Sequence, residues 1–128
     1  MKISGIHHIA VIASDYQRSR RFYTEILGLE IVAEVYREQR DSYKLDLRMP
    51  DGTQIELFSF PSPPPRTSRP EACGLRHLAF SVPDLAAAVR ELRRHGIEPE
   101  PVRVDEYTGK KYTFFADPDA LPLELYEA

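Results

Sequence analysis

Residues 3–13 are mostly apolar and have the length of a β-strand, in which Ile6, His8, Ala10 and Ile12 would share one face and His7, Ile9 and Val11 the other. Asp15 follows as a helix cap, and apolar residues then recur at helical spacing as far as Gly28, which is placed to end the helix. Three shorter extended segments complete the first half of the chain. The pattern therefore predicts a strand, a helix and three strands, at residues 3–13, 15–28, 29–37, 43–48 and 53–59.

The same order returns after a proline-rich stretch, residues 61–72, which cannot donate enough backbone hydrogen bonds to join a sheet. A strand pattern is followed by Asp84, by a helix with Leu85, Val89 and Leu92 as its apolar stripe, and by Gly96 as its stop. The second half is thus predicted to contain a strand, a helix and three strands, at residues 75–82, 84–95, 97–104, 111–116 and 122–127.

The two halves also repeat their polar residues. His8 lies seven residues before Asp15, and His77 lies seven residues before Asp84. His8 and His77 are 69 positions apart, while Glu56 and Glu124, each in the last strand of its half, are 68 positions apart. A single duplication explains both pairs. His7 falls on the other face of the first strand, so it does not share a cavity with His8.

The two glutamates stand between apolar residues, Glu56 between Ile55 and Leu57 and Glu124 between two leucines. A charged carboxylate facing a dry core needs a partner such as a metal ion. Imidazole and carboxylate ligands suit Zn²⁺, Ni²⁺, Co²⁺, Mn²⁺ or Fe²⁺. For any one of these residues the alternative is a solvent-facing glutamate or a buried structural histidine, but four in duplicated register favour a metal site.

Size and composition narrow the class of protein. A chain of 128 residues suits one ordinary core, and a net charge of −3 without a basic run argues against a nucleic-acid partner. No apolar run has the length of a membrane span or the character of a signal peptide, so no membrane partner and a cytoplasmic location are expected. The single cysteine, Cys73, cannot form an internal disulfide, and we expect it to be incidental or to contribute only to packing.

The sequence resembles the vicinal oxygen chelate superfamily, which includes glyoxalase I, bleomycin-resistance proteins and extradiol dioxygenases. The resemblance covers the whole chain, and the run from Tyr107 to Phe115 is similar to a small glyoxalase-like branch. The motifs that carry it are Ile6-His7-His8-Ile9-Ala10, Phe22-Tyr23 with Leu27-Gly28, Leu75-Arg76-His77-Leu78-Ala79-Phe80 and Asp117-Pro118-Asp119 with Leu121-Pro122-Leu123-Glu124-Leu125-Tyr126.

This resemblance implies an α+β fold in which two tandem βαβββ modules, residues 1–60 and 73–128 joined by the linker 61–72, form a curved sheet around a metal site. It implies His8, Glu56, His77 and Glu124 as ligands of one divalent ion, with Zn or Ni expected first and Co, Mn or Fe also compatible. Such relatives often form homodimers, so the site lies either within one chain or across two.

The implied reaction is that of a lactoylglutathione lyase-like metalloenzyme. Glu56 or Glu124 would act as the base that moves a proton next to a metal-bound oxygen of a small carbonyl or hemithioacetal substrate. Glyoxalase I usually carries an arginine and an asparagine where this chain has Ile12 and Phe60. The substrate is therefore expected to be smaller or less charged than a glutathione conjugate, although a thiol conjugate stays in consideration.

Two further residues are candidates for substrate binding. The segment 105–110 forms either a lid that brings Tyr107 or Lys110 to an anionic substrate or an ordinary polar hairpin turn. His95 at a helix end is expected to be a favourable C-terminal charge rather than a ligand.

Other functions of the superfamily remain open from the sequence. One alternative keeps the metal but changes the reaction to epimerisation, thiol transfer or Fe(II)-dependent oxygenation. Another is a non-catalytic resistance protein that binds a small molecule, against which the two histidines and two glutamates in register argue.

Overall fold

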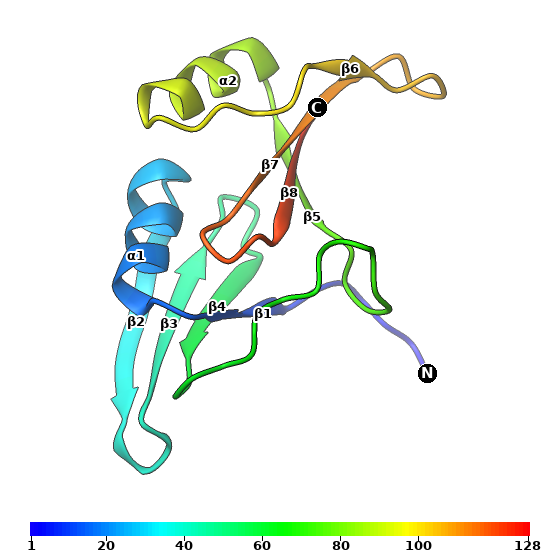
Figure 1. Cartoon of the computed structure of the whole chain (residues 1–128). Coiled ribbons are helices and arrows are strands. Elements are labelled where there is room, and N and C mark those ends of the chain that lie inside the picture. The colour runs from blue at the N-terminus through cyan, green and yellow to red at the C-terminus, as the bar shows by residue number, and fades with distance from the viewer. The chain divides into compact units, whose positions relative to one another are not determined.

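The computed structural model describes all 128 residues and divides into two compact units, Met1–Pro65 and Arg66–Ala128. The division falls inside the proline-rich stretch. Each unit has the order strand, helix, strand, strand, strand and contains its own four-stranded sheet (Figure 1). The predicted fold of tandem βαβββ modules is therefore confirmed.

In the first unit the strand order is β1-β4-β3-β2, with β1 parallel to β4 and the other pairs antiparallel. The predicted cap is present, because the Asp15 side chain accepts a hydrogen bond of 3.1 Å from the backbone N–H of Arg18. The main elements are β1 His8–Ala13, α1 Tyr16–Arg21, β2 Glu30–Arg37, β3 Ser42–Arg48 and β4 Gln54–Ser59.

The second unit repeats this topology, with the strand order β5-β8-β7-β6 and β5 parallel to β8. Asp84 caps the helix by accepting a hydrogen bond of 2.9 Å from the backbone N–H of Ala87. The elements are β5 Leu78–Val82, α2 Leu85–Arg94, β6 Arg103–Val104, β7 Lys111–Ala116 and β8 Pro122–Glu127.

Each sheet buries one face, and the alternation of side chains decides which residues lie on it. In the first unit Leu45, Leu47, Ile55 and Leu57 are fully buried, and α1 contacts β4. The second unit buries Leu123 and Leu125 of β8, which α2 contacts, together with the predicted stripe Leu85, Val89 and Leu92 of α2. Because Glu56 and Glu124 alternate with these residues, their side chains leave the sheets on the opposite faces.

Three strands are shorter by three residues or more than the sequence predicts. The first begins at His8 rather than residue 3, because the parallel partner β4 begins at Gln54, directly opposite His8. Strand β5 begins at Leu78 rather than at residue 75, because its parallel partner β8 begins at Pro122 and Leu123 lies opposite Leu78. The segment 97–104 keeps only Arg103–Val104 as a strand, since Pro99 and Pro101 lack the N–H groups that a ladder requires.

The predicted first helix is also divided. The regular α-helix ends at Arg21, and a π-helical segment, Phe22–Ile26, follows it directly. At the end of this segment the N–H of Leu27 donates to the C=O of Phe22 over 3.0 Å. The adjacent aromatic residues Phe22 and Tyr23 are both buried at this widened turn. Gly28 follows in the left-handed conformation, with φ of 72°, as predicted for the residue that ends the helix.

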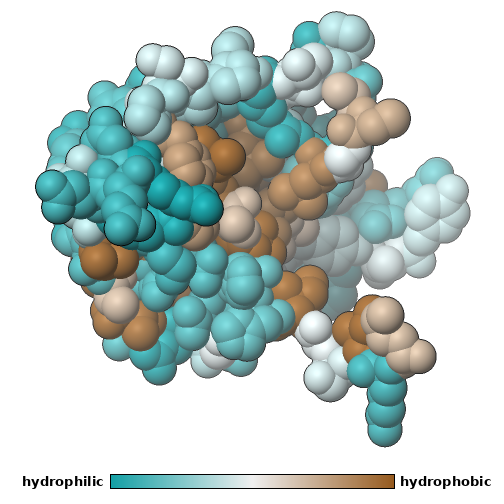
Figure 2. Space-filling view, turned by 90° about the horizontal axis from the view of Figure 1, so that it is seen from below, coloured by the Kyte–Doolittle hydropathy of each residue, from teal (hydrophilic) through white to brown (hydrophobic).

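No helix of the structure has the length and apolar character needed to cross a membrane. The surface carries several hydrophobic side chains among hydrophilic ones (Figure 2). On the edge strand β2, Ile31, Val32, Val35 and Tyr36 are all exposed.

Candidate metal centre

The parallel pairing of the first and last strand brings one histidine and one glutamate together in each unit. In the first unit Ala10 is the register partner of Glu56, and in the second Ala79 is the partner of Glu124. His8 and His77 each precede that alanine by two residues. Each histidine therefore lies on the same side of its sheet as the glutamate of its own unit.

The side chains of each pair face one another. His8 Nε2 lies 3.5 Å from Glu56 Oε2, and His77 Nε2 lies 3.0 Å from Glu124 Oε2. The side chains of Glu56 and Glu124 are only 16% and 11% exposed. Each unit thus brings together two of the four predicted ligands, and within neither unit do three or more potential metal-binding side chains gather.

In each unit the residue before the histidine contacts Nδ1, the ring nitrogen that faces away from the glutamate. His7 Nδ1 lies 2.9 Å from His8 Nδ1, and an Nη1 of Arg76 lies 3.1 Å from His77 Nδ1. In both units this contact leaves Nε2 directed at the glutamate. Arg76 can only donate, so His77 Nδ1 is the acceptor of its contact. The outer partner of a metal-ligating histidine accepts instead, a role that His7 can fill and Arg76 cannot. These two contacts were not predicted, because strict alternation places His7 and Arg76 on the opposite face, whereas both precede the regular strand.

The first unit places a lysine beside its glutamate. Lys44 Nζ donates to Asp46 Oδ1 over 2.6 Å and lies 3.5 Å from Glu56 Oε1. The hydrogen bond to Asp46 is the largest of the effects that raise the pKa of Lys44 above its ordinary value, so this ammonium stays charged. Lys44 and Asp46 were not identified from the sequence, although alternation along the predicted strand 43–48 places them on one face.

The second unit has an aromatic residue where the first has Asp46. Asp46 is the β3 partner of Glu56, and Phe114 is the β7 partner of Glu124. The Phe114 ring meets the His77 ring edge to face, with 5.1 Å between centroids. The His77–Glu124 pair therefore lies in a more apolar setting, without a second carboxylate or a lysine beside it.

Each unit also stacks an arginine over two aromatic rings on this side of its sheet. Arg37 lies over Phe58 and Phe60, with 4.9 and 5.8 Å from Cζ to the ring centroids. Arg103 lies over Tyr112 and Phe114 in the second unit. Arg103 is paired with Glu100 over 2.7 Å, whereas the buried Nε of Arg37 has no hydrogen-bond partner. Neither arginine was identified from the sequence.

The four residues predicted to bind substrate lie in different settings. Ile12 is half exposed on β1 and pairs in register with Phe58, whose ring stacks with that of Phe60. Tyr107 is 90% exposed at the tip of the turn between β6 and β7. Lys110 Nζ donates to the backbone C=O of Ala128 over 2.6 Å. The segment 105–110 is a hairpin turn here, and substrate binding by these residues stays a prediction.

His95 lies at the C-terminal end of α2, where its Nε2 is 3.2 Å from Glu91 Oε1. The expected favourable charge at this helix end stays a prediction. Cys73 is exposed.

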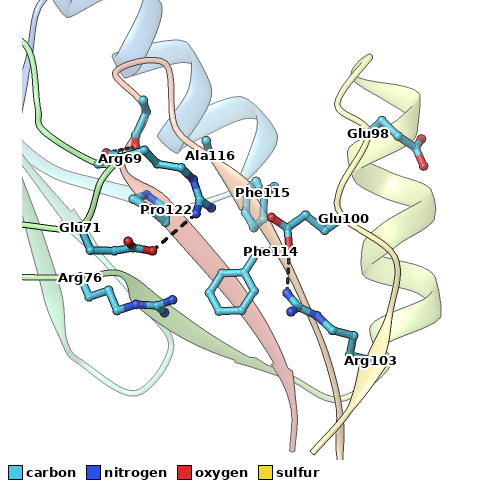
Figure 3. A pocket seen from close by; sticks show the side chains of 12 residues that line it. Arg69, Glu71, Arg76, Glu98, Glu100, Arg103, Phe114, Phe115, Ala116 and Pro122 are labelled. Atoms are coloured by element: carbon cyan, nitrogen blue, oxygen red, sulfur yellow. Dashed lines mark hydrogen bonds and ion pairs between the residues drawn. The ribbon is translucent and has the colours of Figure 1, made fainter.

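A pocket of about 580 Å³ lies in the second unit (Figure 3). Its apolar side includes Phe114 and Pro122, which share the sheet face of Glu124. Its polar side includes Arg69, Arg76 and Arg103. A volume of this size is typical of a small-molecule site.

Comparison with known proteins supplies the family context. The sequence model of the Glyoxalase/Bleomycin resistance protein/Dioxygenase superfamily matches residues 5–125. The Bacillus subtilis (strain 168) protein YwkD is 60% identical over 99% of this chain and 99% of its own length. The Escherichia coli (strain K12) protein YaeR is 62% identical over 98% of this chain and 97% of its own.

Solved structures agree with the fold. The crystal structure of SMU.1112c superposes with a TM-score of 0.94 at 49% identity and covers 98% of this chain and 100% of its own. A more distant relative, 29% identical over 94% of this chain and 78% of its own, is a 2-epi-5-epi-valiolone epimerase from an Actinomyces species. The fosfomycin resistance protein FosX of Listeria monocytogenes, solved with Mn(II), shares the fold at a TM-score of 0.75 and 22% identity over 98% of this chain and 93% of its own.

Proposed function

This chain belongs to the glyoxalase/bleomycin resistance protein/dioxygenase superfamily, and from that premise we propose that it is a divalent-metal-dependent enzyme of the glyoxalase I type. It moves a proton between adjacent carbons of a small carbonyl or hemithioacetal substrate. The observation that carries the proposal is the repeated histidine–glutamate pair, His8 with Glu56 and His77 with Glu124.

The residues fit a divalent ion. Each pair directs an imidazole nitrogen and a carboxylate oxygen at one another from a sheet face, and both glutamates are largely shielded from solvent. Glu124 has no lysine or arginine within ion-pairing distance, so a bound cation would compensate its buried charge. Such nitrogen and oxygen donors suit Zn²⁺, Ni²⁺, Co²⁺, Mn²⁺ or Fe²⁺. That both pairs hold one ion per chain stays a prediction.

In this proposal the glutamates hold and move the proton. A carboxylate that is ionised and shielded from water can accept a proton from a carbon next to a carbonyl and return it to the neighbouring carbon. His7 can accept the Nδ1 proton of His8, which leaves Nε2 of His8 free to bind an ion. Binding of an ion at Nε2 of His77 would require the proton on Nδ1 and so would turn the Arg76 guanidinium away from that ring. A divalent ion, when bound, supplies Lewis acidity that stabilises negative charge developing on substrate oxygens.

The same proton transfer also serves an epimerase, which is the activity that the Actinomyces relative's name gives to that protein. A lyase of the glyoxalase I type and an epimerase differ in where the proton returns rather than in how it is removed. The substrate therefore decides between these reactions, and the pairs described above serve both.

One observation favours a second candidate, an Fe(II)-dependent oxygenase. Lys44 lies 3.5 Å from Glu56. If Glu56 stays paired with Lys44, the chain offers His8, His77 and Glu124 as donors. Two histidines and one carboxylate are typical of non-haem Fe(II) oxygenases.

The experiment that tests the proposal uses protein stripped of metal and then reloaded separately with Ni²⁺, Co²⁺, Zn²⁺, Mn²⁺ or Fe²⁺. Bound metal per chain is measured first, and isomerisation of the methylglyoxal–glutathione hemithioacetal is then followed in D2O with deuterium incorporation as a second readout. We expect metal-dependent turnover that falls roughly 10²–10⁴-fold in Glu56→Gln or Glu124→Gln. Glu25→Gln is the matched control, since Glu25 is exposed, does not line the pocket of the second unit and belongs to neither pair.

Each outcome of this experiment is informative. Protein that binds none of these ions rejects the metalloenzyme. Metal binding without hemithioacetal turnover rejects that substrate, and epimerisation and oxygenation are then assayed with the same reloaded samples. The homodimer and the use of a thiol conjugate also stay predictions, which sedimentation and substrate comparison test.

A further inference from the structure

The pocket of the second unit contains an arginine without a carboxylate partner. Of the arginines that line it, Arg69 lies 3.5 Å from Glu71 and Arg103 lies 2.7 Å from Glu100 (Figure 3). The remaining lining carboxylate, Glu98, is paired with Arg93. Every carboxylate of the pocket thus has a guanidinium.

Arg76 is the arginine left over. Its one side-chain contact is that of Nη1 with His77 Nδ1, at 3.1 Å. A guanidinium carries five N–H donors, so most of its donors stay free for a ligand. A planar guanidinium with free donors matches the geometry of a carboxylate, phosphate or phosphonate group.

The segment that carries Arg76 is held in place from its backbone. Arg66 donates through Nη2 to the backbone carbonyls of Leu75 and Arg76. Ser68 in turn donates to the carbonyl of Ala120 over 2.6 Å, which ties the same segment to the turn between β7 and β8. The backbone of Arg76 is therefore held beside the pocket by hydrogen bonds that do not involve its own side chain.

The pocket adjoins the histidine–glutamate pair of its unit. Phe114 lines the pocket, pairs in register with Glu124 and contacts the His77 ring. Pro122, also in the lining, lies two residues before Glu124 on the same face. An apolar body resting against Phe114 would lie beside both Arg76 and the pair.

We infer that this pocket binds the anionic group of a small substrate, with Arg76 as the anion-binding residue and Phe114 as the apolar surface beside it. The substrate class is a carboxylate, phosphate or phosphonate with a short carbon body. The inference rests on the proposed function in one respect: it takes the His77–Glu124 pair as the place where the bound substrate reacts.

The test uses the full chain and phenylphosphonate, which combines a dianionic group with a ring, and measures its Kd by calorimetry with and without bound metal. Benzoate tests a carboxylate on the same ring, and benzyl alcohol is the uncharged control. We expect Arg76→Gln to weaken phenylphosphonate binding about ten- to a hundredfold, as charged hydrogen bonds do. Arg76→Lys should retain part of the affinity.

Arg94→Gln is the matched control, because it removes an equal charge from α2 that is paired with Glu91 and lies outside the pocket. It should change the Kd less than threefold. An equal loss in Arg94→Gln, or unchanged binding in Arg76→Gln, overturns the assignment to Arg76. Equal affinity for benzyl alcohol overturns the anionic class.

Metal binding measured on the same samples separates this inference from the proposed function. Intact metal binding with no phenylphosphonate binding overturns the pocket alone. Phenylphosphonate binding that depends on Arg76, in protein that binds no divalent ion, supports the pocket and rejects the metalloenzyme. In protein shown to bind Mn²⁺, broadening of the ring proton signals supports a position beside the pair, and its absence overturns the substrate assignment.

Discussion

Lys44 should oppose metal binding at Glu56. Its ammonium lies 3.5 Å from Glu56 Oε1, and the side chains of Lys44 and Glu56 are 27% and 16% exposed. A divalent ion on the same carboxylate would bring two like charges close together in a partly shielded setting. Replacing Lys44 by methionine keeps most of the side-chain length and removes the charge.

The magnitude follows from Coulomb's law. With roughly 6 Å between the ammonium and the ion and an effective dielectric constant of about 40–80, the repulsion is about 1.4–2.8 kcal/mol. Physiological salt screens about half of this, leaving about 0.7–1.4 kcal/mol. We therefore expect Lys44→Met to tighten metal binding roughly three- to tenfold. Release of Asp46 from Lys44 acts in the same direction.

The assay is competition for Zn²⁺ between the protein and a chromogenic chelator of known affinity, at two salt concentrations. Lys44→Arg keeps the charge and should bind metal as the unaltered protein does. Arg18→Gln removes a charge from the exposed side of α1 and serves as the control for net charge. Unchanged or weaker Zn²⁺ affinity in a folded Lys44→Met protein would refute the reasoning and indicate that Lys44 positions Glu56.

Three further predictions concern stability. Asp84→Ala should cost about 1 kcal/mol by removing the cap of α2 and lower the Tm by roughly 3–5 °C, whereas Asp84→Asn should retain most of the stability. The pKa of Glu34 is held below its ordinary value, first by the hydrogen bond from Arg20 and then by that from Tyr16. The stability that the Glu34 carboxylate contributes is therefore fully present above its ordinary pKa and is lost as the pH falls through its lowered pKa. In denaturant titrations from pH 6 down to about pH 2.5, the free energy of unfolding should fall less in Glu34→Gln than in the unaltered protein. Gly96 lies in the left-handed region, with φ of 77°. Gly96→Ala should therefore lower the free energy of unfolding by about 1 kcal/mol, and Gly96→Asn by less. An equal loss in both variants would contradict left-handed backbone strain as the cause of the destabilisation.

The helix α2 supports the strand that carries Glu124. Asp84 and Gly96 bound α2, and α2 contacts β8, the strand that carries Glu124. Loss of either feature should weaken the second unit without touching a candidate ligand. Metal affinity measured on these variants at a temperature where they stay folded should equal that of the unaltered protein.

Much of the candidate site was predictable because it depends on local periodicity and on duplication. Alternation places Glu56 and Glu124 on the face away from the buried leucines of β4 and β8, and the structure agrees. The repeated spacing of His8 and His77 identifies which histidine of the first strand matches that of the second half. Side-chain direction along a strand is fixed by the backbone itself, so the sequence carries this information.

The contacts around each pair were not predictable in this way. His7 lies against His8, and Arg76 lies against His77, because the regular strands begin only after these residues. Where a strand begins depends on where its partner begins, and that partner is distant in sequence. The proximity of Lys44 to Glu56 likewise depends on the register between β3 and β4.

The order of elements, the duplicated βαβββ architecture and the faces of the two histidine–glutamate pairs are all encoded in local sequence. Each of these follows from the two-residue period of strands, from helix caps and stops such as Asp84 and Gly96, and from spacing along the chain. The strand ends, the partners of each imidazole and the place of the Arg76 guanidinium at its pocket depend on how distant segments pack together. The physical reason is that an ion pair or a ring contact forms between side chains whose separation is set by strand register and rotamer, and both depend on packing between segments far apart in the sequence.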